Sequence, residues 1–140
     1  MIIHAGCEDV DLDLIAGCDV LITDPPYSPH VHDNATSTRT GGVGPESRDL
    51  GFGALTPELR DYIALCASVM KRWSIVFTDF EGFEAWRNAM ASAGLEYIRP
   101  IPWVRWSQPQ ISGDRPPTGA ELVVVWHAMG PVGPRGGQPK

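Results

Sequence analysis

Residues 19–27 read Asp-Val-Leu-Ile-Thr-Asp-Pro-Pro-Tyr, and this stretch decides the fold class. A continuous apolar run bounded by turn residues is typical of a strand buried on both faces. The two prolines end the run abruptly, because proline lacks a backbone donor and forces the residue before it out of the helical conformation. The sequence therefore predicts a buried strand over 19–23, followed at its carboxyl end by the acidic turn Asp24-Pro25-Pro26-Tyr27.

Helical and strand patterns alternate on both sides of this stretch. A short helix is expected over residues 8–16, with Val10, Leu14 and Ile15 facing inward and Gly17 ending it. Thr56 and Pro57 begin a second helix, and a third covers 81–93. The apolar face of the second helix contains residues spaced by three and four: Leu59, Ile63, Cys66, Met70 and Trp73.

Strands are expected over 74–78, 95–106 and 121–126. Pro100 and Pro102 confine the middle one to a sheet edge or a bulge, because proline cannot donate to a strand ladder. Alternating strands and helices that end in a hairpin predict an α/β fold. The domain is expected over residues 1–128, with a Gly/Pro-rich linker or tail over 129–140.

The composition excludes several classes of protein. The chain has 140 residues and a formal net charge of −6, with 43% hydrophobic and 20% charged residues, as in one globular domain. An acidic chain does not bind nucleic acid through general surface charge, so binding of nucleic acid would need a specific pocket. No apolar run is long enough to span a membrane and no secretion signal opens the chain, so we expect a cytoplasmic protein.

Three cysteines, Cys7, Cys18 and Cys66, are an odd number without a CxxC pair, so we expect reduced and mostly buried thiols and no zinc ribbon. Residues 28–54 carry no hydrophobic period, as in a functional loop or lid. His30, His32 and Asp33 in this loop offer metal-ligand chemistry, but no further ligand follows at a motif spacing, and we expect no metal.

The Asp24-Pro25-Pro26-Tyr27 turn after a buried strand resembles the DNA amino-methyltransferases, in the form typical of the adenine enzymes. Further likenesses cover nearly the whole chain: residues 2–10 with 18–27, Trp103-Val104-Arg105, and Gly113-Asp114-Arg115-Pro116 with Glu121. Their order is that of the permuted class whose catalytic half comes first, with phage and restriction-modification members closest in character. The resemblance implies a Rossmann-like methyltransferase sheet with helices on both faces, S-adenosylmethionine as cofactor and double-stranded DNA as partner.

The four turn residues suit methyl transfer to an exocyclic amino group. The Asp24 carboxylate and the Pro25 carbonyl can each accept an amino hydrogen and stabilise the positive charge that develops on nitrogen. Pro25 and Pro26 fix the turn, and Tyr27 offers a stacking face for a flipped adenine. We therefore expect these four residues to be catalytic, with Asp24 also contacting the cofactor. None of the cysteines follows a proline, as the nucleophile of the ring-carbon cytosine enzymes does.

Two departures from the family pattern concern the cofactor. The family's Gly-Asp-Cys near the start is here Ala5-Gly6-Cys7, so Cys7 and Glu8 are the nearest candidate contacts. The family's Phe-x-Gly-x-Gly loop has no counterpart in the chain. We therefore expect the catalytic half of an enzyme completed by a missing C-terminal half or a partner subunit. The alternatives are a non-catalytic relic that binds DNA or a partner, and an enzyme acting on an RNA base or a cytosine amino group.

Overall fold

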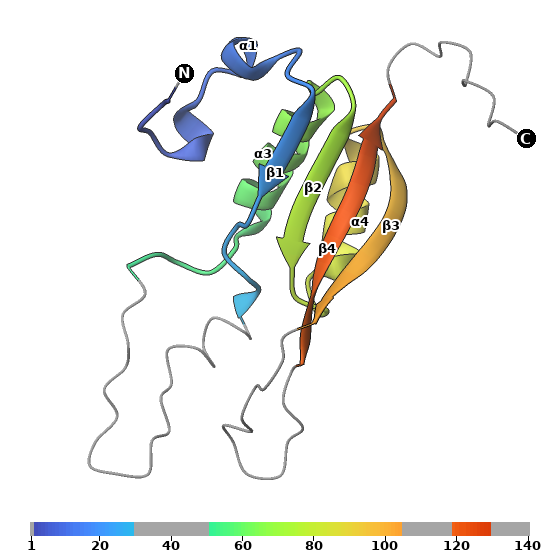
Figure 1. Cartoon of the computed structure of the whole chain (residues 1–140). Helices are drawn as coiled ribbons and strands as arrows, with labels where there is room; N and C mark the ends of the chain where they lie inside the picture. The colour runs from blue at the N-terminus through green and yellow to red at the C-terminus, as the bar shows by residue number, and fades with distance from the viewer. Residues whose placement is uncertain (1, 30–50, 105–118, 130–140) are drawn as a thin grey trace, which may run out of the picture.

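A computed structural model describes residues 2–29, 51–104 and 119–129, which form a four-stranded sheet with helices (Figure 1). The strands are β1 (Val20–Thr23), β2 (Trp73–Thr78), β3 (Leu95–Val104) and β4 (Ala120–Ala128), in the spatial order β1-β2-β4-β3. β1 is parallel to β2, and β4 is antiparallel to both β2 and β3. The α/β class and the closing pair of antiparallel strands are confirmed.

Two long helices, α3 (Pro57–Ser68) and α4 (Phe83–Ser92), cover one face of the sheet. α3 connects β1 to β2, and α4 connects β2 to β3, which is parallel to β2 because both are antiparallel to β4. Both crossovers run in the same direction along the sheet. Because crossovers between parallel strands are right-handed, two that run in the same direction place their helices on the same face. In the part of the chain that the structure describes, α3 and α4 thus lie on the same face, and the prediction of helices on both faces is wrong there.

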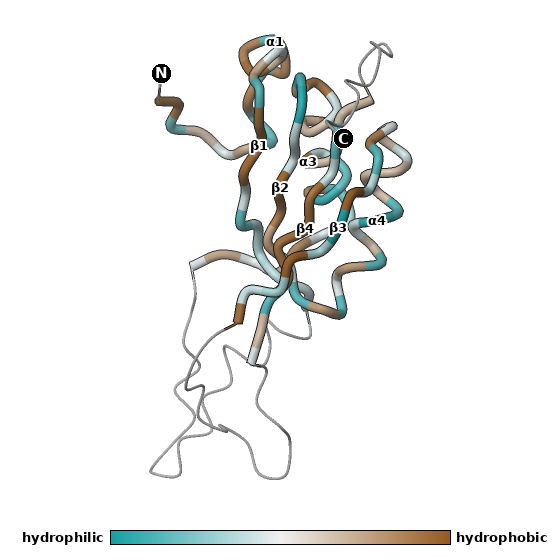
Figure 2. Tube along the Cα trace, turned by 45° about the vertical axis from the view of Figure 1, so that its right-hand side comes forward, coloured by the Kyte–Doolittle hydropathy of each residue, from teal (hydrophilic) through white to brown (hydrophobic). Residues whose placement is uncertain are grey.

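The core lies between the sheet and these two helices. Alternate residues of β2 and β4 face it, and Val76, Val124, Trp86 and Met90 are completely buried. On the opposite face, which we call the outer face, the residues between them are half-buried, and Ile22 at its margin is 67% exposed. Figure 2 shows hydrophobic stretches within β2 and β4. The outer face of these two strands carries four apolar, half-buried side chains: Ile75, Phe77, Val123 and Val125.

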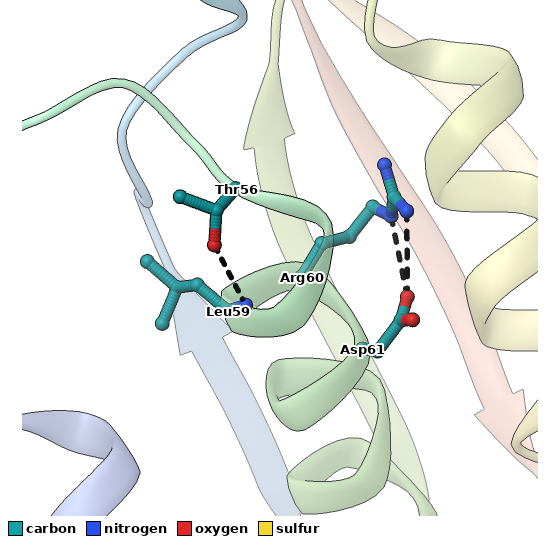
Figure 3. A network of polar contacts seen from close by, with 4 residues as sticks. All are labelled: Thr56, Leu59, Arg60 and Asp61. Carbon is teal, nitrogen blue, oxygen red and sulfur yellow. Dashed lines mark hydrogen bonds and ion pairs between the residues drawn. The ribbon is translucent and has the colours of Figure 1, made fainter.

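Local signals set the ends of the helices. The Thr56 hydroxyl accepts a hydrogen bond from the Leu59 backbone N–H at 3.2 Å, which caps α3 (Figure 3). The neighbouring Arg60 and Asp61 form an ion pair at 3.4 Å on the same first turns. Gly94 follows α4 with φ of 80°, the left-handed conformation that ends helices most readily with glycine.

Several expectations fail in detail. The predicted helix over 8–16 is two short pieces, η1 (Cys7–Asp9) and α1 (Leu12–Ile15), because the Asp11 carboxylate accepts from the Asp13 N–H and starts a new helix. Leu14 is exposed rather than inward. Trp73 begins β2 instead of extending α3.

The predicted burial of the cysteines is wrong for two of the three, because Cys7 and Cys18 are exposed and only Cys66 is buried. The prediction that β1 is buried on both faces is wrong, because Val20 and Ile22 are exposed. Among the described strands, none pairs with the other edge of β1. β3 lies at a sheet edge with an irregularity between Tyr97 and Arg99, as its prolines predict. None of the described helices is long and apolar enough to cross a membrane.

Candidate functional site

The candidate site lies where the parallel strands β1 and β2 end. Because Val20 pairs with Trp73 and Thr23 with Val76, the carboxyl ends of the two strands lie at the same edge of the sheet. Asp24 follows β1 and Asp79 closely follows the end of β2. This edge is where open α/β sheets bind their ligands.

The predicted catalytic turn follows β1 at this edge. Asp24 is exposed, Pro25 is buried, and Pro26 and Tyr27 are half-buried. The buried proline ring anchors the turn to the protein, and the neighbouring carboxylate is open to a ligand. The arrangement supplies an accessible acceptor on a rigid support, which a site for an amino group requires.

Two long-range hydrogen bonds hold the backbone after the turn. The Leu55 N–H donates to the Tyr27 carbonyl at 3.0 Å, which joins the turn to the segment before α3. The Ser28 N–H donates to Asp79 Oδ2 at 2.9 Å, which joins it to the end of β2. The turn is therefore fixed from two sides.

Sequence reasoning missed Asp79. The signal was available, because Asp79 directly follows a predicted strand, as Asp24 does, and the carboxyl ends of parallel strands meet at one edge. Asp79 is 6% exposed, and its Oδ1 also accepts from the Gly82 N–H.

An aromatic pair lies near the same edge on the outer face. Trp103 on β3 and Phe77 on β2 meet edge to face, with ring centroids 6.0 Å apart at 60°. Trp103 is 55% exposed, so it is not a core residue.

Cys7 and Glu8, the predicted cofactor contacts, lie in the short helix at the start of the chain. Their segment, η1, contacts α3, and the Tyr62 hydroxyl on α3 donates to the Val10 carbonyl at 2.6 Å. Partial burial and the Glu8 carboxylate raise the pKa of the Cys7 thiol, and a hydrogen bond from its own backbone N–H lowers the pKa of Glu8. The assignment of these two residues to the cofactor stays a prediction.

Other predicted features lie in segments that the structure does not describe. His30, His32 and Asp33 fall there, as does most of the loop over 28–54 and the tail after 129. Over residues 2–29, 51–104 and 119–129, no three His, Cys, Asp or Glu side chains gather in a way that could hold a metal ion.

Comparison with known proteins bears on the fold. No protein-family model matches the sequence, and no curated protein matches it. Among solved structures, the fold is similar to that of the M1.HpyAVI–SAM complex, with a TM-score of 0.53 and 16% sequence identity. The match covers 83% of this chain and 46% of that one, so this chain spans about half the length of its structural neighbour. The likeness shows that this chain shares an open α/β fold with that protein.

Proposed function

We propose that this chain is the catalytic half of a DNA methyltransferase, which moves a methyl group from S-adenosylmethionine to the exocyclic amino group of a flipped adenine. The observation that carries the proposal is the accessible Asp24 carboxylate on the buried Pro25, at the carboxyl end of β1. A fold shared with a protein solved in complex with SAM supports it.

The residues of the turn fit the chemistry of an aromatic amine. The amine nitrogen is a weak nucleophile because its lone pair is delocalised into the ring. Hydrogen bonds from the amino group to Asp24 and to the Pro25 carbonyl oppose that delocalisation and stabilise charge developing on nitrogen. S-adenosylmethionine would supply the methyl group as an electrophile on its sulfonium and would leave as the neutral thioether. The methylated nitrogen then loses a proton, for which the Asp24 carboxylate is a nearby acceptor.

We further propose that double-stranded DNA is the partner and that the flipped base stacks on Tyr27. Stacking of a base on an aromatic ring contributes about 1–3 kcal/mol, which offsets part of the few kcal/mol needed to unstack it. The chain carries a net charge of −6, so its own surface gives DNA little general attraction. Selection of the substrate therefore depends on the residues of the turn and on the element that completes the enzyme.

The completing element is a missing C-terminal half or a partner subunit, and the free side of the sheet supports this. Among the described strands, β1 pairs with β2 alone, so its other edge offers unpaired backbone groups beside the candidate site. The outer face of the sheet is apolar and open, with Ile22 and Trp103 more than half exposed. We propose that the completing segment adds a strand beside β1 and covers this face.

A single-turnover assay tests the function. The chain, in excess over DNA, is incubated with about millimolar S-adenosylmethionine, a level that compensates for weak binding. Nucleosides from the digested DNA are then analysed by mass spectrometry. N6-methyladenine is expected from the wild type and not from Asp24→Asn, whose amide keeps the shape but loses the charge.

The matched control is Asp19→Asn, which changes an exposed carboxylate at the opposite end of the same strand and leaves the turn untouched. It should methylate DNA like the wild type. N4-methylcytosine instead of N6-methyladenine would assign the cytosine amino group, and equal activity in Asp24→Asn would refute the catalytic role of Asp24. No product from the wild type, with tight DNA binding retained, would favour the non-catalytic reading.

A further inference from the structure

A buried carboxylate links the end of β2 to the candidate catalytic turn. Asp79 is 6% exposed, and its two oxygens accept from two different backbone segments. Oδ2 accepts from the Ser28 N–H at 2.9 Å, and Oδ1 accepts from the Gly82 N–H at the start of α4. One side chain thus ties the turn after β1 to the turn after β2.

Burial of the Asp79 carboxylate costs folding free energy, so its position needs a physical explanation. Burial of a charge is unfavourable unless hydrogen bonds compensate for the lost water. Among the described residues, Asp79 forms no ion pair, and its carboxylate accepts hydrogen bonds from backbone N–H groups. Pairing by backbone N–H groups fixes the position of the backbone, whereas an apolar side chain would fill the space without fixing it.

The position that it fixes is that of the catalytic turn. Ser28 is four residues after Asp24, and the two prolines between them leave few free backbone dihedrals. A displacement of about 1 Å at a reacting group costs on the order of 100-fold in rate. The hydrogen bond that holds the Ser28 N–H therefore also limits the movement of Asp24.

We propose that Asp79 is a positioning residue: its carboxylate clamps the Asp24–Ser28 turn to the end of β2 and so holds Asp24 in the geometry of methyl transfer. The role in methyl transfer rests on the proposed function. The clamp itself is a property of the folded chain and can be measured without any substrate.

Two variants disturb the clamp by different routes. Asp79→Asn leaves one oxygen to accept and places an NH₂ group against the other N–H, so one hydrogen bond is lost. Gly82→Ala keeps the charge, but the added Cβ would lie 2.8 Å from Asp79 Oδ1 and 2.8 Å from Thr78 Oγ1, so the carboxylate must move. Matched controls are Asp61→Asn, an exposed carboxylate on α3, and Gly119→Ala, where an added Cβ meets no atom of the described residues within 4 Å.

Amide hydrogen exchange in the full chain, followed by NMR, tests the clamp. The Ser28 amide should exchange about tenfold or more faster in Asp79→Asn and Gly82→Ala, with both controls like the wild type. The amides of Val76 and Val124 in the core strands should keep their rates. Unchanged exchange at Ser28 would overturn the clamp. So would equal acceleration at Ser28 and in the core, since that would make Asp79 a general stability residue.

The single-turnover assay then tests the link to the reaction. Asp79→Asn and Gly82→Ala should slow methyl transfer about tenfold at saturating DNA, while the S-adenosylmethionine concentration for half-maximal rate stays unchanged. A wild-type rate in a variant with a loosened Ser28 amide would overturn the positioning role. If the wild type transfers no methyl group, the proposed function fails, and the exchange measurement still decides whether Asp79 clamps the turn.

Discussion

The two faces of β4 offer a direct test of the one-sided packing. Val124 is completely buried against the helices, and Val123, the residue before it, is half-buried on the outer face. Val124→Ala and Val123→Ala make the same chemical change on the same strand. Any loss of intrinsic strand propensity is common to both variants, so the difference between them measures the packing of the two faces.

The expected magnitudes follow from burial. Removal of two methyl groups from Val124 loses about 1.6 kcal/mol of transfer free energy at about 0.8 kcal/mol each. A cavity term adds about 1 kcal/mol, because Trp86, Met90 and Trp126 pack around this core and collapse only partly. We expect Val124→Ala to lower the free energy of unfolding by about 2–3 kcal/mol. Val123→Ala should cost below about 1 kcal/mol, since an open face leaves no enclosed cavity.

Urea unfolding followed by circular dichroism and by the combined tryptophan fluorescence of the chain gives both values. For a domain of this size, 1 kcal/mol corresponds to about 3–5 °C in the melting temperature, so the two variants should differ clearly in a thermal scan as well. Equal losses in the two variants would refute the one-sided core. A larger loss for Val123→Ala would mean that the outer face is the better packed one.

Three further predictions concern the chain alone. Calorimetry should show S-adenosylmethionine binding in about the millimolar range, because the chain lacks a glycine-rich cofactor loop, and micromolar binding would reveal a cofactor site elsewhere. Gly94→Ala should cost about 1 kcal/mol of unfolding free energy in a melting experiment, because its φ of 80° strains any side chain, whereas Gly119→Ala should cost little. Burial raises the pKa of the Cys66 thiol above the ordinary 9.0, so its contribution to stability is complete below pH 9 and is lost as the pH rises through the higher folded pKa; a Cys66→Ala variant, unfolded in urea between pH 8 and 11, should show a weaker alkaline loss.

The sequence predicted the elements well where a pattern has one physical cause. The strand over 74–78 and the helix over 81–93 match β2 and α4, because the apolar spacing of each agrees with its turn and cap signals. The candidate site follows from the same logic, since two prolines after a strand leave little freedom in what Asp24 can do. Spacing alone misled at Trp73, which continues the helical period of α3 but lies in β2, because a period does not mark where a helix ends.

Asp79 shows why part of the site escaped prediction. Its partners, Ser28 and Gly82, are 51 residues before it and three residues after it, and no local pattern reports a hydrogen bond across 51 residues. The position of Asp79 after a strand could be predicted from the sequence. Its role depends on the parallel pairing of β1 with β2, which belongs to the tertiary structure. A residue that contacts a ligand can be predicted from its type and its position after a strand. A residue that positions such a residue through long-range hydrogen bonds can be identified only once the fold is known.

The apolar sequence of β1 and the position of Asp24 both relate to the place of β1 at the edge of the described sheet. In an open α/β sheet, a ligand crevice forms where successive crossovers turn in opposite directions from a common strand. Both described crossovers advance from β1 toward β3, so β1 lies at the edge where such a reversal would begin. Ile22 is apolar yet 67% exposed on that strand, and Asp24 is two residues further on. A strand added beside β1 would create the reversal, bury apolar surface around Ile22 and form a crevice beside Asp24. Completion of the sheet and tight binding of the methyl donor should therefore occur together, and substitution of Ile22 by a charged residue should weaken both while leaving the helix-covered core intact.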